Sequence, residues 1–160
     1  MTTRRSPGRV AAALAATLLV GLVGLVGGCA YGPSSADTSA ALTMTAALDE
    51  AASAVEVGLL VVELVDTDRT TTPVADGTLR DALLEVGSAS GSLADALPPR
   101  HLQDARARAL DAVADATAAL TDARAWVNDL AGGSAHDLTG ALSDAADAVD
   151  AVTADLEAAA

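Results

Sequence analysis

This chain is poor in the residues that carry most recognition chemistry. It has no lysine, phenylalanine or isoleucine, and it has one tryptophan, one tyrosine and one cysteine among 160 residues. Nucleic-acid binding requires clustered cationic side chains and usually aromatic stacking platforms. Sugar-binding clefts also normally present aromatic rings. We therefore expect no nucleic acid as a partner and no hydrolysis of wall glycans, and a single cysteine cannot form an internal disulfide.

Alanine supplies 40 of the 160 positions, and 51% of all residues are apolar. This composition excludes a disordered tail and a collagen-like repeat, and the length limits the chain to one domain. Because an alanine side chain is a single methyl group, we expect a thin core.

Charge divides the chain into two parts. Arg4, Arg5 and Arg9 precede the first acidic residue, Asp37, and an uncharged apolar run extends from Val10 to Val26. This run ends in Val26-Gly27-Gly28-Cys29, which resembles the lipobox of bacterial lipoproteins: an aliphatic residue three positions before a cysteine, then two small residues.

The resemblance implies that residues 1–28 are a signal peptide, that a dedicated peptidase cuts between Gly28 and Cys29, and that Cys29 carries a diacylglyceryl group. The expected partners are then the lipoprotein-processing enzymes and the membrane itself, and the location is the extracytoplasmic face of the cell membrane. Two acyl chains give stable anchoring, which one chain does not. The alternative is an uncleaved signal anchor with an incidental thiol at Cys29, which also places the domain outside the cytoplasm.

Residues 29–37 are expected to form the lipidated cysteine and a short Gly/Pro/Ser-bearing spacer. The chain from Cys29 onward carries six arginines and all 22 acidic residues, a formal charge of −16. Since this charge is repelled by an anionic bilayer, we expect the domain to stand off the membrane.

Beyond the spacer, apolar residues recur at alternating steps of four and three, which predicts helices with one buried stripe each. We predict an all-α fold, an alanine-rich antiparallel up-down-up-down four-helix bundle, because the links are short and the helices match in length. The expected helices span about 38–66, 73–97, 100–131 and 135–158. Thr72-Pro73 is the expected start of the second helix, and Ser134 to Asp137 indicates a capping box at the fourth.

Each predicted helix contributes core residues at this spacing: Leu48, Leu59 and Val62; Leu79, Leu83 and Leu97; Val113, Leu120 and Leu130; Leu142, Val149 and Leu156. Arg106 is the one poor fit in these stripes. Leu60, Val61, Leu64 and Val65 widen the first stripe, so we expect the late half of that helix to be the most buried. Replacing Leu59 or Leu83 with Ala is expected to cost about 2–5 kcal/mol.

The polar residues give no catalytic or metal site. A dimetal bundle needs Glu-x-x-His pairs, which the chain lacks, so His101 and His136 are expected to be exposed or capping residues near helix starts. The acidic residues recur at steps of three, four and seven, as a solvated helix face does, rather than in calcium loops. Asp76 with Arg80 and Asp104 with Arg108 are expected to form i,i+4 pairs.

Two further features have competing interpretations. Gly87 and Gly91 favour close helix packing, with a kink that admits a ligand or partner helix as the alternative. Trp126 is expected to anchor the core or its boundary, and it is also the candidate partner contact because no other large ring lies in the predicted helices.

These features predict a non-enzymatic, lipid-anchored helical module of the bacterial envelope that contacts an unidentified envelope protein or acts as a spacer, without a cofactor. The alternative is a lipoprotein that binds a small ligand or metal ion and serves an uptake or sensing system. An enclosed pocket with converging polar groups would favour the alternative.

Overall fold

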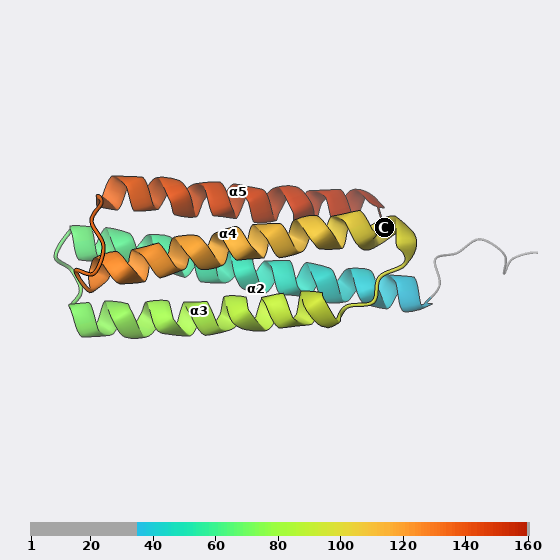
Figure 1. Ribbon diagram of the computed structural model, residues 1–160, viewed down its shortest axis with the longest axis horizontal. Coiled ribbons are helices and arrows are strands. Elements are labelled where there is room, and N and C mark those ends of the chain that lie inside the picture. Colours follow the sequence, from blue (N-terminus) through green and yellow to red (C-terminus); the bar gives the residue numbers. More distant parts are fainter. Residues whose placement is uncertain (1–34, 160) are drawn as a thin grey trace, which may run out of the picture. The chain divides into compact units, whose positions relative to one another are not determined.

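The computed structural model describes residues 35–159, which form a helical bundle (Figure 1). Within this range there are four α-helices, one short 3-10 helix and no strand. The elements are α2 (Ser35–Asp66), α3 (Thr72–Asp95), η1 (Arg100–Leu102), α4 (Gln103–Val127) and α5 (Ala135–Ala159). The prediction of an all-helical domain with four long helices is confirmed, although α2 begins three residues earlier than expected and α4 ends four residues earlier.

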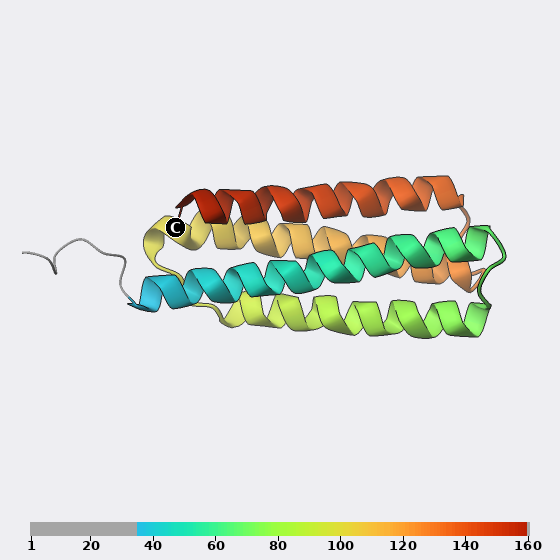
Figure 2. The same cartoon turned by 180° about the vertical axis from the view of Figure 1, so that it is seen from behind.

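The four long helices lie alongside one another, as both views show (Figure 1, Figure 2). α2 packs along α3 and α5, and α4 packs along the same two helices; α2 also touches α4. None of the described helices is long and apolar enough to cross a membrane.

The core is built from alanine and branched aliphatic residues. Of the 30 buried apolar residues described, 14 are alanine, and none of the buried side chains in this part of the chain is polar. Small side chains at the contact let helix axes approach closely. The largest fully buried side chains are Met44, Leu48, Leu79, Leu93, Leu120, Leu142 and Leu156.

The buried stripe of α2 differs from the prediction. Its most deeply buried stretch runs from Met44 to Val55, whereas Leu60 is exposed and Leu59 is only partly buried. The expectation that the late half is the most buried is therefore wrong. The late half is so rich in aliphatic residues that they occupy every side of the helix, so composition there does not identify the buried side.

Two predicted core leucines lie outside the core. Leu97 follows the end of α3 and is 92% exposed, and Leu130 follows the end of α4 and is 82% exposed. Both continue the seven-residue spacing in sequence, but the helices end before them. For α3 the physical reason is the pair Pro98-Pro99, since the residue before a proline is disfavoured in helical conformation.

Close helix packing occurs at a glycine that the sequence did not single out. A Cβ built on Gly58 would lie 2.6 Å from Leu120 Cδ2 and 3.2 Å from Leu142 Cδ2, so a side chain at this position of α2 would force Leu120 to shift. A Cβ on Gly87 or Gly91 would meet no atom within 4 Å. The expectation of close packing at Gly87 and Gly91 is therefore wrong, and both residues are exposed on α3.

The helix ends are defined by local hydrogen bonds. Ser134 Oγ accepts a hydrogen bond from the Asp137 amide, and the Asp137 carboxylate accepts from the Ser134 amide and from Ser134 Oγ, which confirms the capping box before α5. At α3 the N-cap is Thr71, one residue before the expected Thr72, and Pro73 occupies the first turn.

α2 and α4 both end in a Schellman motif with aspartate at the left-handed position. Asp68 has φ 54° and Asp129 has φ 55°, where glycine is the usual residue. The amide of Arg69 donates to Leu64 O, and the amide of Leu130 donates to Ala125 O, each at 2.8 Å. These six-to-one bonds satisfy carbonyl groups that a helix end otherwise leaves unpaired.

Candidate functional site

The predicted lipidation and cleavage residues, Cys29 and Gly28, lie outside the described residues. Their assignment therefore remains a prediction from the sequence.

Trp126 lies in the last turn of α4 and is partly buried against the core. This position agrees with the expected boundary anchor. Because part of the indole remains accessible, its role as a partner contact stays a prediction.

Both histidines lie near helix starts and are exposed, as expected. His101 belongs to η1, before α4, and His136 is the second residue of α5. Residues 35–159 contain no group of three or more His, Cys, Asp or Glu side chains arranged to hold a metal ion.

The two predicted i,i+4 pairs within helices are wrong. Arg80 contacts the neighbouring Asp81 at 3.5 Å, and Arg108 pairs with Asp155 of α5. Asp76 pairs instead with Arg124 of α4. The physical reason is that an arginine side chain is long enough to reach an adjacent helix, where a carboxylate of α3 or α5 competes with the one a turn away.

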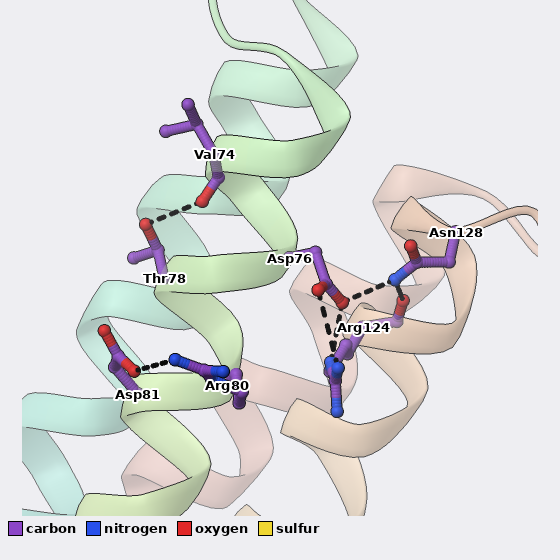
Figure 3. Close-up of polar contacts among 7 residues, drawn as sticks. All are labelled: Val74, Asp76, Thr78, Arg80, Asp81, Arg124 and Asn128. Atoms are coloured by element: carbon purple, nitrogen blue, oxygen red, sulfur yellow. Dashed lines mark hydrogen bonds and ion pairs between the residues drawn. The ribbon is translucent and has the colours of Figure 1, made fainter.

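The contact of Asp76 with α4 is the most elaborate side-chain cluster among the described residues (Figure 3). Arg124 Nε donates to Asp76 Oδ1 at 2.7 Å, and Arg124 Nη2 donates to Oδ2 at 3.4 Å. Asn128 Nδ2 donates to Asp76 Oδ1 at 2.8 Å and also to the carbonyl oxygen of Arg124 at 2.9 Å. One carboxylate of α3 thereby holds Arg124 in the last turn of α4 and Asn128, the residue that caps this helix.

The electrostatics of this cluster stabilise its ionised form. The hydrogen bond from Arg124 is the main reason that the pKa of Asp76 is lowered, and the bond from Asn128 lowers it further. The same bond raises the pKa of Arg124. Both groups are therefore charged near neutral pH, as an interhelical ion pair requires.

A groove of about 520 Å³ adjoins the cluster. It lies between α3 and α4, and its lining includes Asp76, Arg124, Leu83 and the exposed Leu130. Its one hydroxyl, Thr121 Oγ1, donates to the carbonyl oxygen of Thr117 at 2.7 Å. The contacts of Asp76 with Arg124 and Asn128 join α3 to α4 beside this groove.

Arg106 forms a second polar contact between α3 and α4. Its Nε donates to Leu93 O at 2.7 Å, and its Nη2 donates to Ala94 O at 2.5 Å. These are carbonyl groups of the last turn of α3. The sequence signal for this role was the one polar residue in an otherwise apolar stripe.

Another groove lies between α4 and α5 and has a volume of about 300 Å³. Its lining consists of Asp115, Asp122 and Asp144 with four alanines. Acidic residues of two helices therefore come together around this groove.

No protein-family model matches this chain, and no similar curated protein or solved structure was found.

Proposed function

We propose that this protein is a bacterial envelope lipoprotein, held on the extracytoplasmic face of the cell membrane by lipid on Cys29, and that its helical domain acts without catalysis through contact with an envelope protein or as a spacer. The observation that carries the anchor is the sequence order of basic residues, apolar run and Val26-Gly27-Gly28-Cys29. Two acyl chains on one cysteine would provide stable membrane attachment.

The helices are proposed to follow an antiparallel up-down-up-down course. The connections are short, and consecutive long helices pack on each other. Two contacts between α3 and α4 support this course: Asp76 near the start of α3 bonds to Arg124 near the end of α4, and Arg106 near the start of α4 bonds to Leu93 near the end of α3.

The non-enzymatic role is supported by the polar contacts in the groove beside Asp76. The groove beside Asp76 contains polar groups that already bond to one another, which leaves no free acid, base or nucleophile converging on a substrate. A helical module of this kind is suited to binding an envelope protein through an exposed helix face, or to holding such a protein at a fixed distance from the membrane.

The anchor is tested by intact-mass measurement of protein extracted from membranes of a bacterial host. The expected species begins at Cys29 and carries a diacylglyceryl group, and Cys29→Ser is expected to abolish both cleavage and membrane attachment. An unmodified full-length chain would overturn the proposal. Crosslinking in intact cells, followed by mass spectrometry, is expected to recover a reproducible envelope partner.

The second candidate function is binding of a small cation or divalent metal ion in the α4–α5 groove. The three aspartates around that groove would attract a cation electrostatically, although they are not arranged as a coordination site in the described structure. Calorimetry with Ca²⁺ and with Mg²⁺ tests this function, using Asp122→Asn as the variant. Tight binding that this substitution removes, together with no crosslinked partner, would reverse the order of the two candidates.

A further inference from the structure

We propose that one end of the bundle, formed by the start of α2 and the α3–α4 connection, rests on an anionic lipid surface, with Leu97 entering the interface and Arg100 contacting lipid phosphates. We call residues 38–48 and 96–103 together the acid-poor end. The inference rests on the proposed anchor at Cys29, and it replaces the expectation that the whole domain stands off the membrane with contact at one end only.

The two segments of the acid-poor end carry no acidic residue, in a domain that is otherwise rich in them. α2 has no acidic residue between Asp37 and Asp49, the longest such interval after Asp37. The connection 96–103 also has none, and it carries Arg100 and His101, both exposed. Asp95 and Asp104 flank the connection, so the positive charge of Arg100 is confined to a short segment. It suits phosphate groups that approach the connection directly.

Leu97 is the most exposed of the large apolar residues described, at 92%. It is also held in place from both sides. Ala96 and Leu102 are buried, the pair Pro98-Pro99 restricts the backbone between them, and Arg106 fastens the preceding helix end through Leu93 O. An apolar side chain that cannot fold back onto the core is suited to insertion among lipid headgroups.

A second exposed leucine lies on the α2 part of the acid-poor end. Leu42 is 65% exposed, and its surroundings on α2 are Thr38, Ser39, Thr43 and Ala46. The start of α2 and the α3–α4 connection lie at the same end of the bundle in both views (Figure 1, Figure 2). Two exposed leucines and a cationic connection therefore share one end of the bundle, together with the end of α5, which carries Asp155 and Glu157.

The number of residues between Cys29 and α2 limits how far the start of α2 can lie from a lipid anchor on Cys29. Ser35 begins α2 and follows Cys29 by six residues, which span at most about 20 Å even when fully extended. An anchored chain therefore keeps the acid-poor end near the bilayer. Tethering supplies an effective concentration of about millimolar, so a contact too weak to bind free protein suffices.

The test couples the thiol of Cys29, in a chain that begins at that residue, to a maleimide lipid in preformed vesicles. The vesicles contain phosphatidylcholine with phosphatidylglycerol and carry bromine on their acyl chains, which quenches nearby indole fluorescence. Leu97→Trp places a reporter at the acid-poor end. Leu130→Trp is the matched control, because Leu130 is also an exposed leucine in a helix connection, at the other end of α4.

Quenching is expected for the Leu97→Trp protein and not for the Leu130→Trp protein or the parent chain. Trp126 gives the parent signal, and it lies about 35 Å along α4 from Gln103. Adding Arg100→Gln to Leu97→Trp is expected to reduce the membrane-contacting population about five-fold on phosphatidylglycerol vesicles, with no change on pure phosphatidylcholine. Circular dichroism confirms that each variant retains the helical fold.

Absent quenching at position 97, or equal quenching at positions 97 and 130, would overturn the proposed contact. Because the tether is made chemically, this result is independent of acylation in cells. An unlipidated Cys29 in the intact-mass experiment would instead overturn the anchor and leave the vesicle measurement interpretable.

Discussion

Arg106, near the start of α4, donates a hydrogen bond from Nε to the backbone carbonyl oxygen of Leu93, near the end of α3, at 2.7 Å. The last carbonyl groups of a helix lack partners within the helix, and the helix dipole makes this end favourable for a cation. An arginine within an apolar stripe therefore satisfies the end of a neighbouring helix.

Arg106→Met is expected to lower the free energy of unfolding by about 1.5–3 kcal/mol, the range for hydrogen bonds from a charged donor. Methionine keeps an apolar stem and removes the donors. Urea denaturation measures the loss. Arg108→Met is the control, because its ion pair with Asp155 is exposed and is expected to contribute less than about 1 kcal/mol. Equal losses in the two variants would contradict the capping role.

Asp76→Asn is expected to destabilise the protein at neutral pH. Since the folded state lowers the pKa of Asp76, its stabilising effect is present above the ordinary value of 3.8 and is lost as pH falls through the lower folded value. The stability difference between variant and parent should therefore shrink in acid, as urea titrations at several pH values would measure.

Two further variants identify the partner of Asp76. Asp81→Asn is the control, because the Asp81 contact with Arg80 is exposed and joins adjacent residues. A double-mutant cycle of Asp76→Asn with Arg124→Met should show strong coupling, since the two side chains share one ion pair. Additive effects would mean that the ion pair contributes nothing.

Glycine-to-alanine substitutions are expected to differ in sign with position. Gly87→Ala and Gly91→Ala should each stabilise the protein by about 0.5–1 kcal/mol, because the new methyl group meets open space and alanine favours helix. Gly58→Ala should destabilise it by about 1 kcal/mol, since its methyl group would displace the fully buried Leu120. Thermal unfolding of the three variants checks the signs, and a stabilised Gly58→Ala protein would show that the core there yields easily.

Asp68→Gly and Asp129→Gly are each expected to stabilise the protein by about 0.5–1 kcal/mol. Glycine adopts the left-handed conformation without strain, and the change removes a negative charge from the negative end of a helix. Gly133→Ala is the matched control with the opposite expected sign, because Gly133 has φ 130°. Denaturation midpoints measure these shifts, and no gain in either aspartate variant would show that its side chain favours the turn.

Leucine truncations are expected to follow burial in the structure rather than spacing in the sequence. Leu79→Ala and Leu120→Ala should each cost about 2–5 kcal/mol, because both side chains are fully buried. Leu83→Ala should cost less, since Leu83 is only partly buried and lines the groove beside Asp76. Urea denaturation ranks the three, and a loss for Leu83→Ala equal to that for Leu120→Ala would contradict this order.

Periodicity predicted the helices well because each one buries a single stripe. In α5 the predicted Leu142, Val149 and Leu156 are all buried, since alanine and aspartate occupy the other sides and leave one apolar face. In late α2 aliphatic residues cover all sides, so the sequence could not identify the buried one. Helix ends at Asp95 and Val127 depend on local backbone geometry, which seven-residue spacing does not contain.

The polar contacts were harder to predict than the helices. Asp76 was matched with Arg80 because both lie on one helix, yet its partners Arg124 and Asn128 are about 50 positions away in the chain. Finding them requires the relative alignment of α3 and α4. Arg106 was visible as an anomaly, but its acceptors are backbone carbonyl groups, which carry no side-chain signal.

The absence of buried polar side chains from the described core has a consequence for how the helices align. Alanine and leucine layers that repeat about every two turns would pack almost as well if one helix slid by a heptad past its neighbour. The native alignment of α3 and α4 is therefore specified by two polar contacts outside the core. Asp76 bonds to Arg124 near one end of this helix pair, and Arg106 bonds to Leu93 near the other. Removing both polar contacts would leave an apolar core in which α3 and α4 can pack in more than one register.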